Sequence, residues 1–158
     1  MDNYIEWLVK RKRNKFEVVI KGVTIGFTAV FFLIGFTNLL FLVAAVAMGI
    51  ATYFIIMNLD LEYEYLFVNK ELSVDKIMSK SKRKTLININ VQKIAALAPL
   101  GAYEMEHYKR KNLKKLDFSS GNDDAQRYVI IYNDSTDQKY IIIEPNDKIL
   151  SYLKTYVR

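Results

Sequence analysis

The sequence has no cysteine, one histidine and two prolines among its 158 residues. The missing cysteine excludes a disulfide framework, a cysteine-ligated zinc site and a thiol nucleophile. Four of the six glycines lie in one apolar run, and none forms the glycine-rich loop that cradles phosphates. These absences leave little material for catalysis or metal chemistry. We therefore expect no enzyme activity, no catalytic residue, no metal and no cofactor.

Charge is absent from one long stretch. Residues 22–59, 38 in succession, contain no Asp, Glu, Lys or Arg. As a helix this stretch would be about 57 Å long, whereas the hydrocarbon core of a bilayer is about 30 Å thick. A cleaved signal peptide has an apolar part of only about 7–15 residues, so the length argues against one. The run is long enough for two membrane spans.

A turn near the middle of this run is indicated by Gly35 and Asn38, because Gly and Asn favour tight reversals of the chain. This position predicts one span over residues 16–34 and another over residues 39–59, each close to the roughly 20 residues that a span requires. Glu17 and Lys21 then form an i,i+4 pair near the membrane edge. The predicted element is a transmembrane helical hairpin.

The orientation of this hairpin follows from its basic flanks. Bases cluster before the first span and again after the second, and the turn between the spans carries no charge. Basic flanks stay in the cytoplasm, so we expect a two-span protein of the cell membrane with both termini cytoplasmic. Anionic lipid headgroups attract such clusters. The predicted lipid-surface residues are Lys10, Arg11, Lys12, Arg13, Lys15, Lys80, Lys82, Arg83 and Lys84.

Small residues recur at four-residue spacing in both spans, as Gly22 and Gly26 in the first and Ala45 and Gly49 in the second. Such spacing lets helices approach closely, either within the hairpin or between copies in a homo-oligomer. Before the first span, residues 4–9 mix apolar and acidic residues with Trp7. This segment fits a short interfacial helix or the start of the first span, and the sequence leaves both open.

Beyond residue 60 the apolar residues alternate with polar ones, which is typical of strands. Glu62 and Glu64 fall on the predicted solvent face of the first such strand, and Asn69 with Lys70 forms a two-residue turn. We expect further strands at residues 71–78, 85–91, 94–98, 113–118, 128–132 and 140–143, with a basic loop at 79–84 and a turn at 133–139. Asn146 is the expected N-cap of an amphipathic C-terminal helix.

Strands closed by one C-terminal helix resemble the pleckstrin-homology-like (PH-like) fold. The whole chain is also similar to small two-span bacterial membrane proteins of unknown function, through its basic N-terminus and its motifs at residues 61–65, 75–77, 82–84 and 144–146. The expected class is an α+β membrane protein, a transmembrane hairpin followed by a small antiparallel PH-like β-barrel capped by a helix. Expected domains are residues 1–15, a basic N-terminus or interfacial helix, 16–59, the hairpin, and 60–158, the cytoplasmic barrel.

Many pleckstrin-homology domains bind inositol phosphates at the loop of their first hairpin. The shortness of Asn69-Lys70, taken as that loop, gives such a ligand no support. His107 lies beside Glu104 and Glu106, but a metal site needs about three supported ligands, and these side chains are expected to be solvated. The basic segment at residues 109–115 has nearby aromatic residues, yet we expect no nucleic-acid binding.

These observations favour a membrane-anchored interaction module. It would present a PH-like domain at the cytoplasmic membrane face to the bilayer, its anionic headgroups or an unidentified protein partner. The alternative is a small oligomeric channel or transporter accessory subunit whose hairpin carries the function. The small-residue spacing and Asn38 motivate this alternative. The lack of charge within the spans weighs against it.

Overall fold

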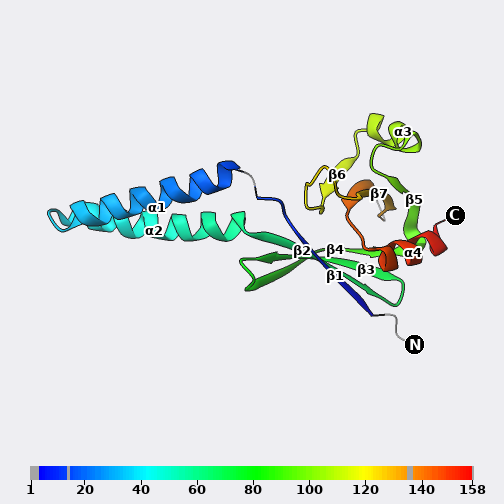
Figure 1. The fold of residues 1–158 in the computed structure, drawn as a ribbon, viewed down its shortest axis with the longest axis horizontal. Coiled ribbons are helices and arrows are strands. Elements are labelled where there is room, and N and C mark those ends of the chain that lie inside the picture. The colour runs from blue at the N-terminus through cyan, green and yellow to red at the C-terminus, as the bar shows by residue number, and fades with distance from the viewer. Residues whose placement is uncertain (1–3, 14, 135–136, 158) are drawn as a thin grey trace. The chain divides into compact units, whose positions relative to one another are not determined.

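The computed structural model describes residues 4–13, 15–134 and 137–157. The described chain divides into two compact units. The first strand, β1 (Ile5–Lys10), comes before the two long helices in the sequence. One unit comprises residues 12–61 and 78–82, and the other comprises residues 1–11, 62–77 and 83–158. Figure 1 shows the helical hairpin of the first unit and the sheets of the second.

The hairpin consists of α1 (Lys15–Gly35) and α2 (Leu39–Leu59), each 21 residues long. Asn38 caps α2, because its side chain accepts a hydrogen bond of 2.9 Å from the backbone N–H of Leu40. Both helices are long and apolar enough to cross a membrane. Most of their large side chains are exposed, for example Leu40 at 75%. The two predicted spans are confirmed as helices, and the predicted reversal near Gly35 and Asn38 is confirmed as the turn that connects them.

The first sheet has the strand order β1-β2-β3-β4, with β2 at Leu61–Val68, β3 at Glu71–Met78 and β4 at Lys82–Asn90. β1 pairs antiparallel with β2 over its full length, with Ile5 opposite Phe67 and Lys10 opposite Glu62. The expectation of a helix before the first span is therefore wrong. Ile5, Trp7 and Val9 alternate with Glu6, Leu8 and Lys10, and this weak alternation predicts a strand only when β2 supplies hydrogen-bonding partners.

Two tight turns connect this sheet. Asn69 and Lys70 both have left-handed backbone, with φ of 47° and 67°, as a two-residue hairpin turn requires. Ser79 and Lys80 also have positive φ, so the chain reverses early and β4 begins at Lys82. The predicted loop over residues 79–84 is therefore too long. Its last three residues are strand.

The second sheet has the order β5-β7-β8-β6, formed by β5 (Ile94–Pro99), β7 (Tyr128–Asn133), β8 (Gln138–Ile143) and β6 (Lys114–Asp117). A short helical turn, η1 (Val91–Lys93), connects the two sheets. β6 pairs with β8 in parallel, so the expectation of an entirely antiparallel domain is wrong. Residues 135 and 136 of the predicted turn at 133–139 lie outside the described residues. Closure of the two sheets into a barrel stays a prediction.

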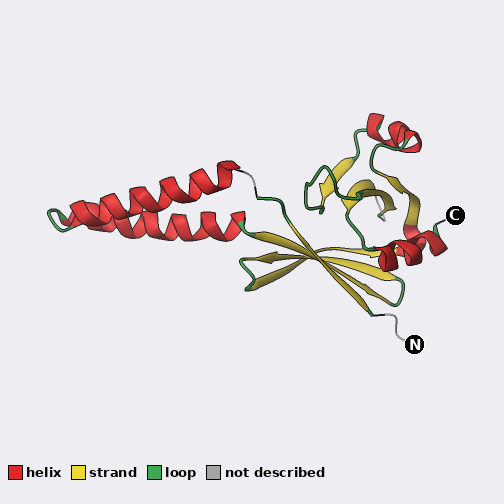
Figure 2. Ribbon diagram, viewed as in Figure 1, coloured by secondary structure: helices red, strands yellow, loops and turns green. Residues whose placement is uncertain are grey.

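One core joins the two sheets to the C-terminal helix α4 (Asp147–Tyr156). Tyr65, Ile89, Ile130 and Leu153 of this core are fully buried or nearly so. Asn146 caps α4 as predicted, because its side chain accepts a hydrogen bond from the Ile149 N–H at 2.9 Å. Figure 2 shows this helix beside the strands of the domain.

The segment between β5 and β6 folds back on the second sheet. It contains η2 (Tyr103–Met105) and the short helix α3 (Glu106–Arg110), which Figure 1 labels. Met105, 1% exposed, packs with Val129, Ile131 and Tyr140 on the face of the sheet away from the main core. Both faces of β7 are therefore covered, which explains its continuous apolar sequence.

Candidate functional site

A group of exposed bases belongs to the same compact unit as the hairpin. It contains bases just before and at the start of α1, and bases between the end of β3 and the start of β4. We name this group the basal cluster. Its members are Lys12, Arg13, Lys15, Lys80 and Lys82. Two stretches separated by more than 60 residues of sequence thus contribute positive charge to one unit.

Asp60, directly after α2, joins these two stretches. Its carboxylate Oδ1 lies 3.3 Å from Nη2 of Arg13, and its carbonyl accepts a hydrogen bond of 2.8 Å from the Ser79 N–H. Its own N–H donates to the Ile56 carbonyl and ends the helix. One acidic residue therefore holds the basic linker and the basic turn at the end of α2, where the apolar part of the hairpin stops.

The other predicted lipid-surface bases lie in the sheet unit. Lys10 and Arg83 contact carboxylates, with Lys10 Nζ 3.7 Å from Glu62 Oε1 and Arg83 Nη2 2.6 Å from Glu64 Oε1. Arg11 and Lys84 are exposed. Of the nine predicted residues, five belong to the basal cluster and two form ion pairs with acidic residues of β2. Their contact with a lipid surface stays a prediction.

Glu62 and Glu64 are buried, at 7% and 2% exposure. The prediction that they form a solvent face is wrong, because β1 and β4 bring basic side chains over them. Burial raises the pKa of Glu64, and Arg83 opposes this rise. Sequence reasoning missed Asp75, 5% exposed, whose Oδ2 lies 3.9 Å from Nε of the same arginine.

His107 lies in the exposed helix α3 between Glu106 and Tyr108. Its ring packs edge-on against the ring of Tyr108, with centroids 5.7 Å apart. Within the described residues, no group of three His, Asp or Glu side chains is arranged to hold a metal ion.

Small residues take different places in the hairpin. Ala45 is buried at 4% exposure, and a Cβ added to Gly49 would lie 3.8 Å from Cγ2 of Thr28 on α1. A Cβ added to Gly22 or Gly26 would meet nothing within 4 Å. Ala45 and Gly49 thus lie toward the other helix, and Gly22 and Gly26 do not. Their role in an oligomer stays a prediction.

Threonines that the sequence reasoning passed over lie between the helices. The hydroxyls of Thr28 and Thr52 are 3.0 Å apart, and Thr28 also donates to the Thr24 carbonyl at 2.8 Å. Hydroxyls at such positions are satisfied without water. A signal for the two threonines of α1 is present in the sequence. Thr24 and Phe31 are seven residues apart, and so are Thr28 and Gly35, which is the spacing of a helix–helix seam.

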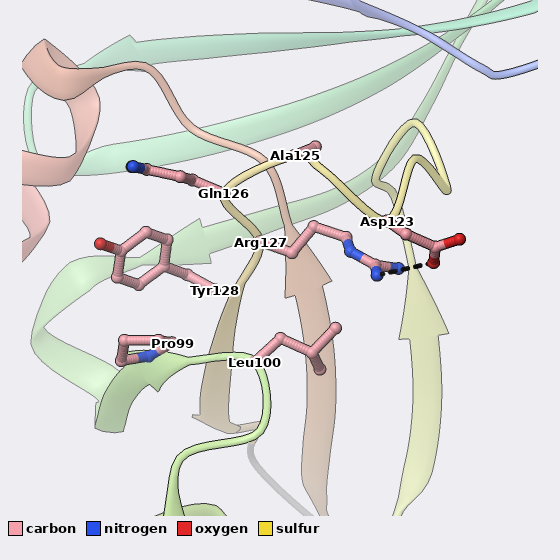
Figure 3. Close-up of a pocket in the computed structure, with 7 residues that line it drawn as sticks. All are labelled: Pro99, Leu100, Asp123, Ala125, Gln126, Arg127 and Tyr128. Atoms are coloured by element: carbon pink, nitrogen blue, oxygen red, sulfur yellow. Dashed lines mark hydrogen bonds and ion pairs between the residues drawn. The ribbon is translucent and has the colours of Figure 1, made fainter.

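A cavity of about 380 Å³ opens at the start of β7. Figure 3 shows that Arg127 extends toward Asp123, whereas Gln126 and Tyr128 extend in another direction. The guanidinium Nη2 lies 3.4 Å from Oδ1 of Asp123, which is itself exposed. The polar groups of this cavity therefore do not converge on one point.

Residues 1–158 match the family model described as Bacterial PH-like domain (DUF6106). The chain belongs to this family. No curated protein and no solved structure matches it.

In this PH-like domain the hairpin interrupts the connection between the first two strands. β1 ends at Lys10 and β2 begins at Leu61, so residues 11–60 form that connection. Asn69-Lys70 joins β2 to β3 and is the second strand connection. The inference that the first hairpin loop is only two residues long is therefore wrong, because it overlooked β1.

Proposed function

We propose that this chain is a membrane-anchored, non-enzymatic interaction module. The hairpin would cross the cytoplasmic membrane twice, and the PH-like domain would lie at the inner face. There it would meet anionic lipid headgroups through the basal cluster, or a protein partner. The observation that carries this proposal is the pairing of β1 with β2 on either side of the apolar hairpin.

Strand pairing restricts the topology. Residues 5–10 precede the helices and residues 62–67 follow them, yet they form one antiparallel ladder. Neighbouring strands lie only about 5 Å apart, so both segments must be on the same side of any membrane. Two helices of 21 residues, about 32 Å each, fit this requirement with one return crossing.

The charge distribution supports a cytoplasmic position for these strands. The basal cluster contributes five bases where α1 begins and α2 ends, and the tip of the hairpin at residues 36–38 has no charge. Bases near span ends favour the cytoplasmic side. Each base held near an anionic surface contributes about 1 kcal/mol of attraction.

Single cysteines test this topology, because the natural chain has none. Phe36→Cys places a thiol at the hairpin tip and Tyr103→Cys places one in the domain, at sites where the native side chains are 75% and 86% exposed. In spheroplasts, a membrane-impermeant maleimide should label Phe36→Cys at once. It should label Tyr103→Cys only after permeabilisation. Labelling of Tyr103→Cys in intact spheroplasts would contradict the proposal.

Neutralising the basal cluster tests its contribution in the same assay. With Gln at all five positions, we expect both thiols to be labelled in part, which reports mixed orientation. The matched control carries Gln at five exposed bases elsewhere, namely Lys93, Lys109, Arg110, Lys114 and Lys148. It should keep the natural pattern. Equal behaviour of the two chains would show that total charge, not the basal cluster, sets orientation.

A further inference from the structure

The first sheet contains a cluster of charged residues on the face that turns away from the main core. Glu6, Glu62, Glu64 and Asp75 alternate along their strands with core residues such as Val9, Tyr65 and Val74. Lys10 shares this face with them. Arg83 of β4 reaches the same cluster. Four strands therefore contribute to it.

Acids outnumber bases in this cluster. Lys10 pairs with Glu62, and the Tyr4 hydroxyl donates to Oε2 of Glu6 at 2.9 Å. Among the described residues, Arg83 is the base that contacts both Glu64 and Asp75. Because the side chains of these two carboxylates are only 2% and 7% exposed, water does not compensate the second negative charge.

Two carboxylate oxygens of this cluster also lack a hydrogen-bond donor. Oε2 of Glu64 and Oδ1 of Asp75 are buried, and neither has a hydrogen-bond partner in the described part of the chain. Almost all buried acceptors in folded proteins have a donor. One proton would cancel one buried charge and convert one carboxylate oxygen from acceptor to donor. A metal cation is a poorer occupant, because the guanidinium is already inside the cluster.

We propose that the folded sheet binds one proton in this cluster, on Glu64, and that this proton secures β1 to the sheet. β1 is an edge strand, and the strand that it pairs with in the sheet order is β2. Loss of the proton would leave two buried negative charges beside Glu6 and would weaken the β1–β2 ladder. The cluster is thus a pH-sensitive clasp on the strand that leads into α1.

Electrostatics supports the position of the proton. Burial raises the pKa of Glu64, and the neighbouring carboxylates of Glu6 and Asp75 act in the same direction, whereas Arg83 lowers it. Because the pKa is raised on folding, the stabilisation is fully present below the ordinary pKa of an unfolded glutamate and is lost as pH rises through the raised pKa.

Carboxyl-carbon NMR of the full chain in nanodiscs tests proton binding. The Glu64 resonance is identified by its loss in Glu64→Gln, and its midpoint should lie above that of an ordinary glutamate. Asp75→Asn removes a neighbouring negative charge and should lower this midpoint, whereas Arg83→Met should raise it. Glu71→Gln, at an exposed position of β3, is the control and should leave it unchanged. A midpoint at or below the ordinary value would overturn the proposal.

Hydrogen exchange of β1 tests the clasp itself. After correction for intrinsic exchange rates, protection of the β1 amides should fall as pH rises from the ordinary pKa of a glutamate to the Glu64 midpoint, and it should level off above that midpoint. In Glu64→Gln, which imitates the protonated side chain, protection should be independent of pH. Protection that is equally insensitive to pH in the natural chain would show that the proton does not secure β1.

Discussion

At the scale of single residues, the Tyr65 side chain connects three parts of the domain. Its hydroxyl donates to the Phe118 carbonyl at 2.6 Å and accepts from the Glu144 N–H at 3.2 Å. The Glu144 carboxylate in turn accepts from the Ser120 N–H at 2.9 Å, and Trp7 Nε1 donates to the Glu144 carbonyl at 3.1 Å. Burial raises the pKa of the Tyr65 hydroxyl, which keeps it protonated as a donor.

Tyr65→Phe should therefore remove the hydrogen-bond partner of the buried Phe118 carbonyl and of the partly buried Glu144 N–H. We expect a loss of about 1–3 kcal/mol in the free energy of unfolding, measured by chemical denaturation in detergent. Tyr63→Phe is the control, since the Tyr63 ring packs on Phe118 with centroids 5.8 Å apart and keeps that contact as phenylalanine. Equal losses in the two variants would refute the role of the Tyr65 hydroxyl.

At the scale of elements, the hairpin closes where Gly35 approaches α2. A Cβ at Gly35 would lie 3.0 Å from Cα and 3.1 Å from the backbone N of Leu42. Backbone atoms move aside less easily than a flexible side chain, so this close approach favours glycine at residue 35. Gly26 has open space, so no such preference applies there.

Gly35→Ala and Gly26→Ala distinguish an effect of close approach between the two helices from a general effect of replacing glycine by alanine in α1. Gly35→Ala should force the helices apart and lower the thermal unfolding temperature in detergent, corresponding to about 1–3 kcal/mol. Gly26→Ala should leave that temperature unchanged. If both variants unfolded at the temperature of the natural chain, a methyl group at residue 35 would not disturb the contact between the helices.

At the scale of the whole molecule, the hairpin is inserted between two strands that are direct neighbours. Lys10 and Glu62 lie opposite each other, and paired residues have Cα atoms about 4.5–5.5 Å apart. A two-residue turn spans this gap. Replacing residues 11–61 with Asn-Gly should therefore give a folded domain that is soluble without detergent, as measured by gel filtration and circular dichroism.

A chain that begins at residue 62 is the matched control, because it lacks the hairpin and also lacks β1. It exposes the edge of β2 and loses Val9 from the core, so it should aggregate or unfold. If the Asn-Gly chain behaved in the same way, the sheet would depend on the hairpin itself. The channel or transporter-accessory alternative stays a prediction.

Local patterns determined much of this protein from its sequence. The uncharged run, the turn near Gly35, the Asn69-Lys70 turn and the Asn146 cap each depend on residues a few positions apart, so their physical causes can be read along the chain. The membership of one PH-like family was also readable from motifs spread over the chain.

Only the tertiary structure decided the pairings across long sequence distances. β1 becomes a strand because β2, more than 50 residues later, supplies its partners. Glu62 and Glu64 are buried because Lys10 and Arg83 arrive from other strands, and the basal cluster forms because Asp60 binds two separate segments. A sequence pattern fixes which side chains alternate, but burial and charge pairing depend on which segments meet in space.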